Sequence, residues 1–179
     1  GVRECVHLNN AGCGLMTSSV MTAVKDHIDL EGRIGGYEAA NVMSEQLDAV
    51  YDELAALVGA QRAEIAVMDN ATVAWDHAFY ALKFKPGDRI LTSQAEYGAN
   101  YVAFLQRAHA EGLTIDAVPN DAHGALDVAA LSSMIDERVA LIAVTWIPTN
   151  GGLVNPAVAI GKVAKQHNIP YLLDACQAV

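Results

Sequence analysis

The stretch IPYLLDACQAV, residues 169–179, decides the fold class of this chain. It begins as a short apolar run and ends on a carboxylate at Asp174, followed by a polar turn. A second run, VALIAVTWI at 139–147, is apolar almost throughout. Near-continuous apolar runs of this length are typical of parallel strands that are buried on both faces of a sheet. The two runs therefore predict a parallel sheet that helices cover on each side.

Outward from these runs, strand patterns alternate with helix patterns. Strands are also predicted at 6–8, 64–69, 89–93 and 114–119. Helices are predicted at 17–31, from about 42 to 58, and at 74–82, 100–111, 127–135 and 156–167, from apolar spacing and capping residues. Gly32, Gly35 and Gly36 predict an open loop. Strands that alternate with helices imply right-handed crossovers, so the predicted fold class is α/β, a three-layer sandwich with a mostly parallel sheet.

Composition narrows the class of function. The 179 residues are 53% hydrophobic and 18% charged, with a net charge of -10, which argues against a nucleic-acid partner. No apolar window is long enough to span a membrane, and the first residues lack the pattern of a signal peptide. Three cysteines form no close pair, which favours reduced thiols and a cytoplasmic location over a disulfide framework or a metal site.

Candidate site residues follow the ends of successive predicted strands, where ligands bind in parallel sheets. Asp174 ends an apolar strand, and a carboxylate there needs either a cation or hydrogen-bond donors. Thr72 and the backbone around it open a helix, which suits a phosphate, although simple capping by Asn70 or Thr72 would explain the same residues. Tyr97 is either a stacking aromatic or a packing residue. The loop 146–156 either reaches a ligand or merely turns the chain.

Taken in order, these segments resemble a known family. HLNNAGCGLM, GGYEAA, VMDNATVAW, ILTSQAEYGAN, PTNGGLVNP and YLLDACQAV are similar to stretches of the class V aminotransferase family of fold-type I pyridoxal 5'-phosphate (PLP) enzymes. This group contains cysteine desulfurases, isopenicillin N epimerase-like proteins and ergothioneine C–S lyases. The resemblance covers almost the whole chain and implies the N-terminal part of the family's large domain.

The resemblance also implies roles for single residues. Asp174 would pair with the pyridine nitrogen of PLP, and Gln177 would bond its O3' oxygen. Tyr97 would stack on the ring. The remaining cofactor contacts would be Ala71 and Thr72 at the phosphate and Thr149, which stands where desulfurases usually have Asn. The substrate would lie near Asn10, Ala11, Gly12 and Asn150.

The implied activity is that of a PLP enzyme acting on an amino acid through an external aldimine, most simply as a C–S lyase or cysteine desulfurase. An aminotransferase or epimerase of the same family is the alternative. The family's Schiff-base lysine lies beyond the DACQ motif, and none of the lysines present matches it: Lys25, Lys83, Lys85, Lys162 and Lys165. The isolated chain is therefore expected to be inactive, and a non-catalytic role as a truncated or split-enzyme partner is the further alternative.

The resemblance finally implies a homodimer and a division of the chain into two parts. Residues 1–40 would form an N-terminal segment near the substrate site and the dimer boundary. Residues 41–179 would form a partial PLP-binding large domain. An ordinary nucleotide-binding domain is disfavoured, because the sequence has no glycine-rich GxGxxG loop after its first strand.

Overall fold

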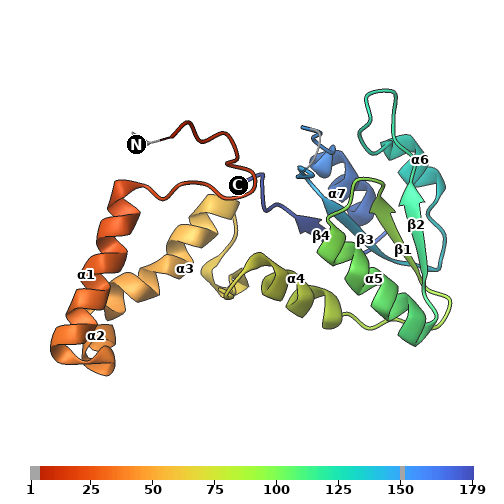
Figure 1. Cartoon of the computed structure of the whole chain (residues 1–179). Helices are drawn as coiled ribbons and strands as arrows, with labels where there is room; N and C mark the ends of the chain where they lie inside the picture. The colour runs from red at the N-terminus through yellow and green to blue at the C-terminus, as the bar shows by residue number, and fades with distance from the viewer. Residues whose placement is uncertain (1–4, 150–151) are drawn as a thin grey trace. The chain divides into compact units, whose positions relative to one another are not determined.

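The computed structural model describes residues 5–149 and 152–179 (Figure 1). The chain divides into two compact units, residues 1–67 and 68–179, each with its own internal contacts. None of the helices in the described ranges is long and apolar enough to cross a membrane.

The N-terminal unit is helical. It contains α1 (Ser18–Ile34), α2 (Gly36–Val42), α3 (Ser44–Val58) and a short 3-10 turn, η1 (Arg62–Glu64). The Thr17 hydroxyl accepts a hydrogen bond from the Val20 amide at 3.4 Å and so begins α1 where the sequence predicted. Gly59, in the left-handed conformation with φ 69°, ends α3. The prediction of these two helices is confirmed.

The predicted open loop at the three glycines is wrong. Gly32 lies inside the last turn of α1, and Gly36 already begins α2. Only Gly35 breaks the helix, with φ 95°, while its amide still donates to the Glu31 carbonyl at 2.8 Å. A single residue with positive φ therefore makes the turn between the two helices, where the sequence predicted a loop over residues 32–36.

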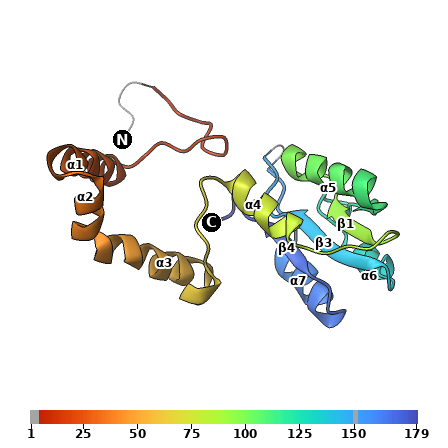
Figure 2. The same ribbon diagram turned by 90° about the horizontal axis from the view of Figure 1, so that it is seen from below.

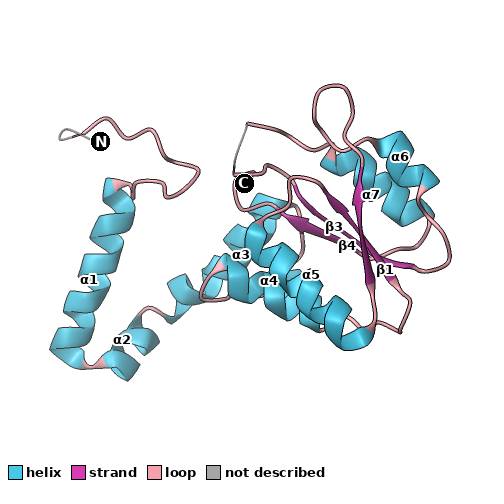
Figure 3. Ribbon diagram, turned by 45° about the vertical axis from the view of Figure 1, so that its right-hand side comes forward, coloured by secondary structure: helices cyan, strands magenta, loops and turns pink. Residues whose placement is uncertain are grey.

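The C-terminal unit has the alternating order that the sequence predicts: α4 (Ala71–Tyr80), β1 (Arg89–Ser93), α5 (Gly98–Glu111), β2 (Thr114–Val118), α6 (Val128–Ser133), β3 (Val139–Thr145), α7 (Ala157–Gln166) and β4 (Tyr171–Asp174). The strands are all parallel and lie in the order β2-β1-β3-β4. Figure 3 shows the sheet between two groups of helices.

Two apolar clusters, one on each face of the sheet, hold the three layers together. One lies between the sheet and α6 with α7, where Leu91, Ile142 and Val144 meet Leu131 and Ile160. The other lies between the opposite face and α4 with α5 (Figures 1 and 2), and it contains Trp75, Phe79, Ile90, Phe104 and Leu141. Neighbouring strand residues such as Ile90 and Leu91 enter opposite clusters because side chains alternate across a strand. Both faces are buried, which explains why β3 lacks a polar face.

Two of the predicted strands are not strands. Residues 6–8 have no regular structure, and 64–69 is an extended segment that follows η1. A strand is defined by hydrogen bonds to a neighbouring strand, and within the described ranges neither segment pairs with a strand. The apolar character of EIAVMD is therefore not sufficient to make a strand.

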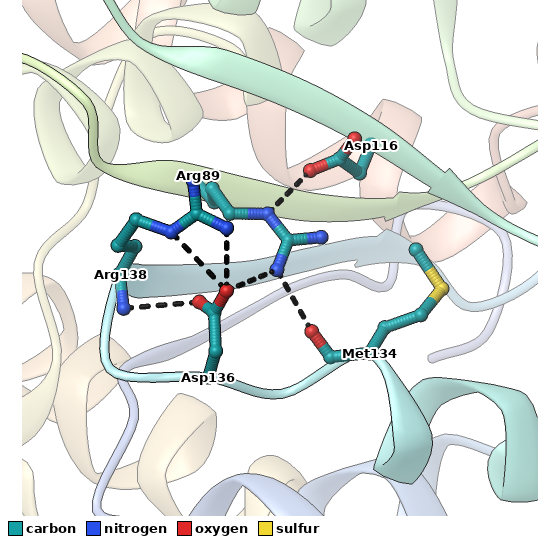
Figure 4. A network of polar contacts seen from close by, with 5 residues as sticks. All are labelled: Arg89, Asp116, Met134, Asp136 and Arg138. Atoms are coloured by element: carbon teal, nitrogen blue, oxygen red, sulfur yellow. Dashed lines mark hydrogen bonds and ion pairs between the residues drawn. The ribbon is translucent and has the colours of Figure 1, made fainter.

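An ion-pair network ties the elements together at the end of the sheet where β1 and β3 begin (Figure 4). Arg89 Nε donates to Asp116 Oδ2 at 2.7 Å, and Arg89 Nη1 donates to the Met134 carbonyl at 2.9 Å. Asp136 pairs with both Arg89 and Arg138, at 3.1 and 2.7 Å. Hydrogen bonds from Arg138 hold the pKa of Asp136 below its usual value. The network joins β1, β2 and the end of α6, which is a structural role.

Candidate active site

The strand order places a crevice at the carboxyl ends of β1 and β3. The chain leaves β1 for β2 on one side and then crosses back to β3 on the other. Ligands bind at such reversals in open α/β sheets, because the loops diverge there. A hollow of about 250 Å³ lies at this point, lined by Ala95, Glu96, Tyr97, Gly98, Pro148 and Thr149. The structure thus brings the predicted Tyr97 and Thr149 to one pocket.

Asp174 ends β4 beside Thr145, the last residue of β3. Its Oδ2 accepts a hydrogen bond from Asn100 Nδ2 at 2.8 Å, and its Oδ1 accepts one from the Cys176 amide at 3.1 Å. No ion pair to Asp174 occurs anywhere in ranges 5–149 and 152–179. The sequence left open whether this carboxylate meets a cation or hydrogen-bond donors, and the structure provides donors.

The turn after β4 fixes the neighbours of Asp174. The Ala178 amide donates to the Ala175 carbonyl at 2.9 Å, and half-buried Gln177 lies within this turn. Burial, with a smaller contribution from the nearby Asp174 charge, raises the pKa of the Cys176 thiol. Gln177 is therefore close in sequence and in space to the end of β4.

Glu96 is a site residue that the sequence analysis missed. Its carboxylate accepts hydrogen bonds from the Thr92 hydroxyl, the Tyr97 amide and Asn100 Nδ2, at 3.1, 2.9 and 3.0 Å. The backbone amide and hydroxyl of Thr145 also donate to it. These partners belong to β1, β3 and the first turn of α5. One carboxylate therefore ties the two strand ends to the helix that follows.

The start of α4 confirms one of the two roles that the sequence left open there. Asn70 Oδ1 accepts a hydrogen bond from the Val73 amide at 3.0 Å, so Asn70 caps the helix. Among the described residues no acceptor meets the amides of Ala71 and Thr72, and both residues are exposed. Helix α4 packs against β4, and Figure 1 shows it beginning on the side where β4 ends. Free amides at a helix N-terminus suit an anion.

A buried asparagine holds the loop that carries Thr149. Asn155 is 1% exposed; its Nδ2 donates to the Thr145 carbonyl at 2.8 Å, and its Oδ1 accepts from the Leu126 amide at 3.0 Å. The Asn155 amide donates to the Trp146 carbonyl at 2.8 Å, which closes the loop at its base. Asn150 lies outside the described residues.

The predicted substrate residues Asn10, Ala11 and Gly12 lie in a turn of the N-terminal unit and are exposed. The Cys13 amide donates to the Asn9 carbonyl at 3.1 Å across this turn, and His7 Nε2 lies 2.9 Å from the Cys13 carbonyl oxygen. Their approach to the strand ends, which lie in the other unit, stays a prediction.

Comparisons with known proteins show which family and which relatives the chain is similar to. The family model described as aminotransferase class-V matches residues 6–179. A cysteine desulfurase of Dickeya dadantii is 40% identical over 96 residues, 54% of this chain and 23% of its own length. A probable cysteine desulfurase of Halobacterium salinarum is 28% identical over 185 residues, 99% of this chain and 45% of its own. The chain thus spans less than half the length of these curated relatives.

Solved structures with the same fold include two of C-DES, named in one of them as a cystine C–S lyase. A variant with glycine covalently linked to its PLP cofactor matches with a TM-score of 0.88 and 20% identity, over 99% of this chain and 48% of its own. The complex with cysteine persulfide matches with a TM-score of 0.86 and 21% identity, over 97% of this chain and 48% of its own. The likeness confirms the predicted α/β fold class.

Proposed function

Since the chain belongs to the class V aminotransferase family, a family of PLP-dependent enzymes, we propose that it forms the cofactor-binding part of an enzyme that cleaves a C–S bond of an amino acid. Its curated relatives include cysteine desulfurases, and cysteine or a related thiol amino acid is the proposed substrate. Transamination and epimerisation are the alternative outcomes on the same cofactor.

One observation carries the proposal. The partly buried Asp174 carboxylate stands at the end of β4 with two hydrogen-bond donors and, among the described residues, no cation. Its two hydrogen bonds come from neutral donors, so the carboxylate can still accept a cationic group. A protonated pyridine nitrogen is such a group, and the hollow at Tyr97 and Thr149 lies at the carboxyl ends of β1 and β3, in the same sheet as β4. The donor set and the charge of the site therefore fit PLP.

When bound, PLP supplies an electron sink, because its protonated ring can accept the electron pair that a breaking substrate bond releases. The protein's part is to keep the ring protonated and in place. Asp174 would keep the ring protonated by placing a carboxylate at the ring nitrogen. Tyr97, which lines the hollow, would pack on the ring, and Gln177 would donate a hydrogen bond to the O3' oxygen.

Phosphate binding falls to the start of α4. The amides of Ala71 and Thr72 and the Thr72 hydroxyl provide donors, and the helix dipole favours an anion there. Thr149 completes the cofactor contacts. Asn150 is proposed to bind the substrate carboxylate. Asn10, Ala11 and Gly12, in the N-terminal part, residues 1–40, are proposed to lie near the substrate.

Pyridoxamine 5'-phosphate tests the site directly. It has no aldehyde and cannot form an imine with a surface lysine, so its binding reports only the ring and phosphate contacts. Asp174→Asn keeps the side-chain size but removes the charge, and Thr72→Val removes the hydroxyl. A charge-assisted contact contributes about 1.5–3 kcal/mol, so Asp174→Asn should weaken binding about 10- to 100-fold by calorimetry.

Asp26→Asn is the matched control, because Asp26 is an exposed acid on α1. It should bind pyridoxamine 5'-phosphate as the unchanged protein does. Equal binding by Asp174→Asn and the control, or no binding by any variant, would contradict the proposal.

The outcome of the reaction needs a separate measurement. C–S cleavage of cysteine releases sulfur from carbon, whereas transamination leaves the C–S bond intact and moves the amino group. The measurement uses a protein that also contains the family's Schiff-base lysine; with PLP and cysteine present, sulfide or protein-bound sulfane sulfur would support the lyase assignment. A thiol keto acid without released sulfur would support the aminotransferase instead.

The proposal includes a homodimer in the cytoplasm. Helix α1 exposes an apolar stripe at helical spacing, Val20, Met21, Val24 and Ile28, each at least 44% exposed. Such a stripe suits burial against a second copy. Sedimentation should show a dimer that Val24→Glu dissociates; a monomer at all concentrations would remove this part.

A further inference from the structure

Asn100 connects the two carboxylates of the site. It is 3% exposed, on the first turn of α5, and its Nδ2 donates to Asp174 Oδ2 at 2.8 Å and to Glu96 Oε1 at 3.0 Å. Both acceptors lack hydrogens when ionised, so only the nitrogen of the Asn100 amide can face them. The two N–H groups of one amide are thus divided between two acids.

Glu96 is itself immobilised. Its carboxylate receives five donated hydrogen bonds among the described residues, from Thr92, Tyr97, Asn100 and twice from Thr145. Thr92 and Thr145 are buried strand residues at 0% and 1% exposure. The Glu96 carboxylate is therefore fixed to the sheet. Asn100 donates to both Glu96 and Asp174, so it links the position of Asp174 to that fixed carboxylate.

We propose that Asn100, anchored by Glu96, is a positioning residue that holds the Asp174 carboxylate in the orientation needed to pair with the cofactor's ring nitrogen. The inference rests on the proposed function, because the ring is the partner of Asp174. Tyr97 follows Glu96 directly and donates its amide to the same carboxylate. Tyr97, assigned to the ring's face, and Asp174, assigned to its nitrogen, are thus both held through hydrogen bonds that involve Glu96.

Two opposite effects of removing Asn100 can be told apart. Loss of a donor makes a carboxylate more basic, which alone would strengthen its pairing with a protonated ring. Loss of orientation moves the charge away from the nitrogen and weakens the pairing. Because Asp174 Oδ2 has no other donor in the described part of the chain, the positioning effect should win.

The test uses bound pyridoxamine 5'-phosphate and follows the ring-nitrogen pKa by absorbance across a pH titration. In Asn100→Ala we expect this pKa to fall and the affinity to drop about tenfold, at the low end of effects seen for residues that orient a ligand-binding group. Asn100→Thr, close in volume with at most one donor, keeps the test open if the alanine variant does not fold. It should shift the pKa in the same direction.

A double-mutant cycle shows whether Asn100 acts through Asp174. In the Asp174→Asn background, adding Asn100→Ala should change neither the affinity nor the ring pKa further. Leu131→Ala, in the cluster on the other face of the sheet, is the stability control: it should lower the melting temperature but leave the ring pKa unchanged.

The results separate the two proposals. The positioning role is overturned, and the proposed function stands, if Asp174→Asn weakens binding but the Asn100 variants do not. The same conclusion follows if the Asn100 variants raise the ring-nitrogen pKa. Additive effects in the cycle also overturn it. If the unchanged protein does not bind pyridoxamine 5'-phosphate, both are overturned.

Discussion

Replacing Asn155 by alanine should destabilise the C-terminal unit strongly, although Asn155 lies outside the proposed cofactor contacts. The side chain is 1% exposed and satisfies two buried backbone groups, the Thr145 carbonyl and the Leu126 amide. Alanine fills neither role. The variant leaves both backbone groups without a partner at the base of the loop that carries Thr149.

The magnitude follows from those two groups. A buried donor or acceptor left unsatisfied costs about 1–3 kcal/mol, so the loss of unfolding free energy should be about 2–6 kcal/mol. With a urea slope of about 2 kcal/mol per molar, the unfolding midpoint should fall by about 1–3 M. The slope itself should not change, because the surface exposed on unfolding stays nearly the same.

Tryptophan fluorescence isolates the unit in question. The sequence contains 2 tryptophans, Trp75 and Trp146, and both lie in the C-terminal unit. Asn120→Ala, which trims an exposed asparagine in a neighbouring loop, is the control and should shift stability by less than about 0.5 kcal/mol. If Asn155→Ala behaves like this control, the two hydrogen bonds do not hold the loop, and the reasoning is refuted.

Other predictions concern interactions away from the site. Arg138 lowers the folded-state pKa of Asp136, so the stabilisation that Asp136 provides is present above about pH 4 and is lost as the pH falls through its folded value. The melting-temperature difference between the unchanged protein and Asp136→Asn should therefore shrink in acid; a gap that stays constant from pH 7 to about pH 3 would exclude the linkage. Arg107 donates to the carbonyls of Tyr80 and Leu82 and lies 4.9 Å from the Phe84 ring centroid, and methionine keeps only its packing. Arg107→Met should cost about 1–3 kcal/mol in urea unfolding, and no loss would mean that solvent replaces these bonds.

Local signals were enough for most elements. Thr17, Asp127 and Gly112 lie at the helix ends where their capping chemistry predicts. The predicted strand at 89–93 matches β1 residue for residue. Capping and helical spacing act within a few residues, so the chain encodes them locally. The segment 64–69 failed because a strand also needs a neighbour, which no local pattern reveals.

The candidate site divides in the same way. The sequence by itself determined that Asp174, Tyr97 and Thr149 follow strand ends, because apolar runs mark where strands stop. It offered one signal for Glu96 and Asn100, an acid and an amide four residues apart at the start of a helix. Only the tertiary structure decided that this pair would meet Asp174, 74 positions after Asn100. The strand order β2-β1-β3-β4 brings these ends together, and strand order depends on long-range pairing, which no short stretch of sequence contains.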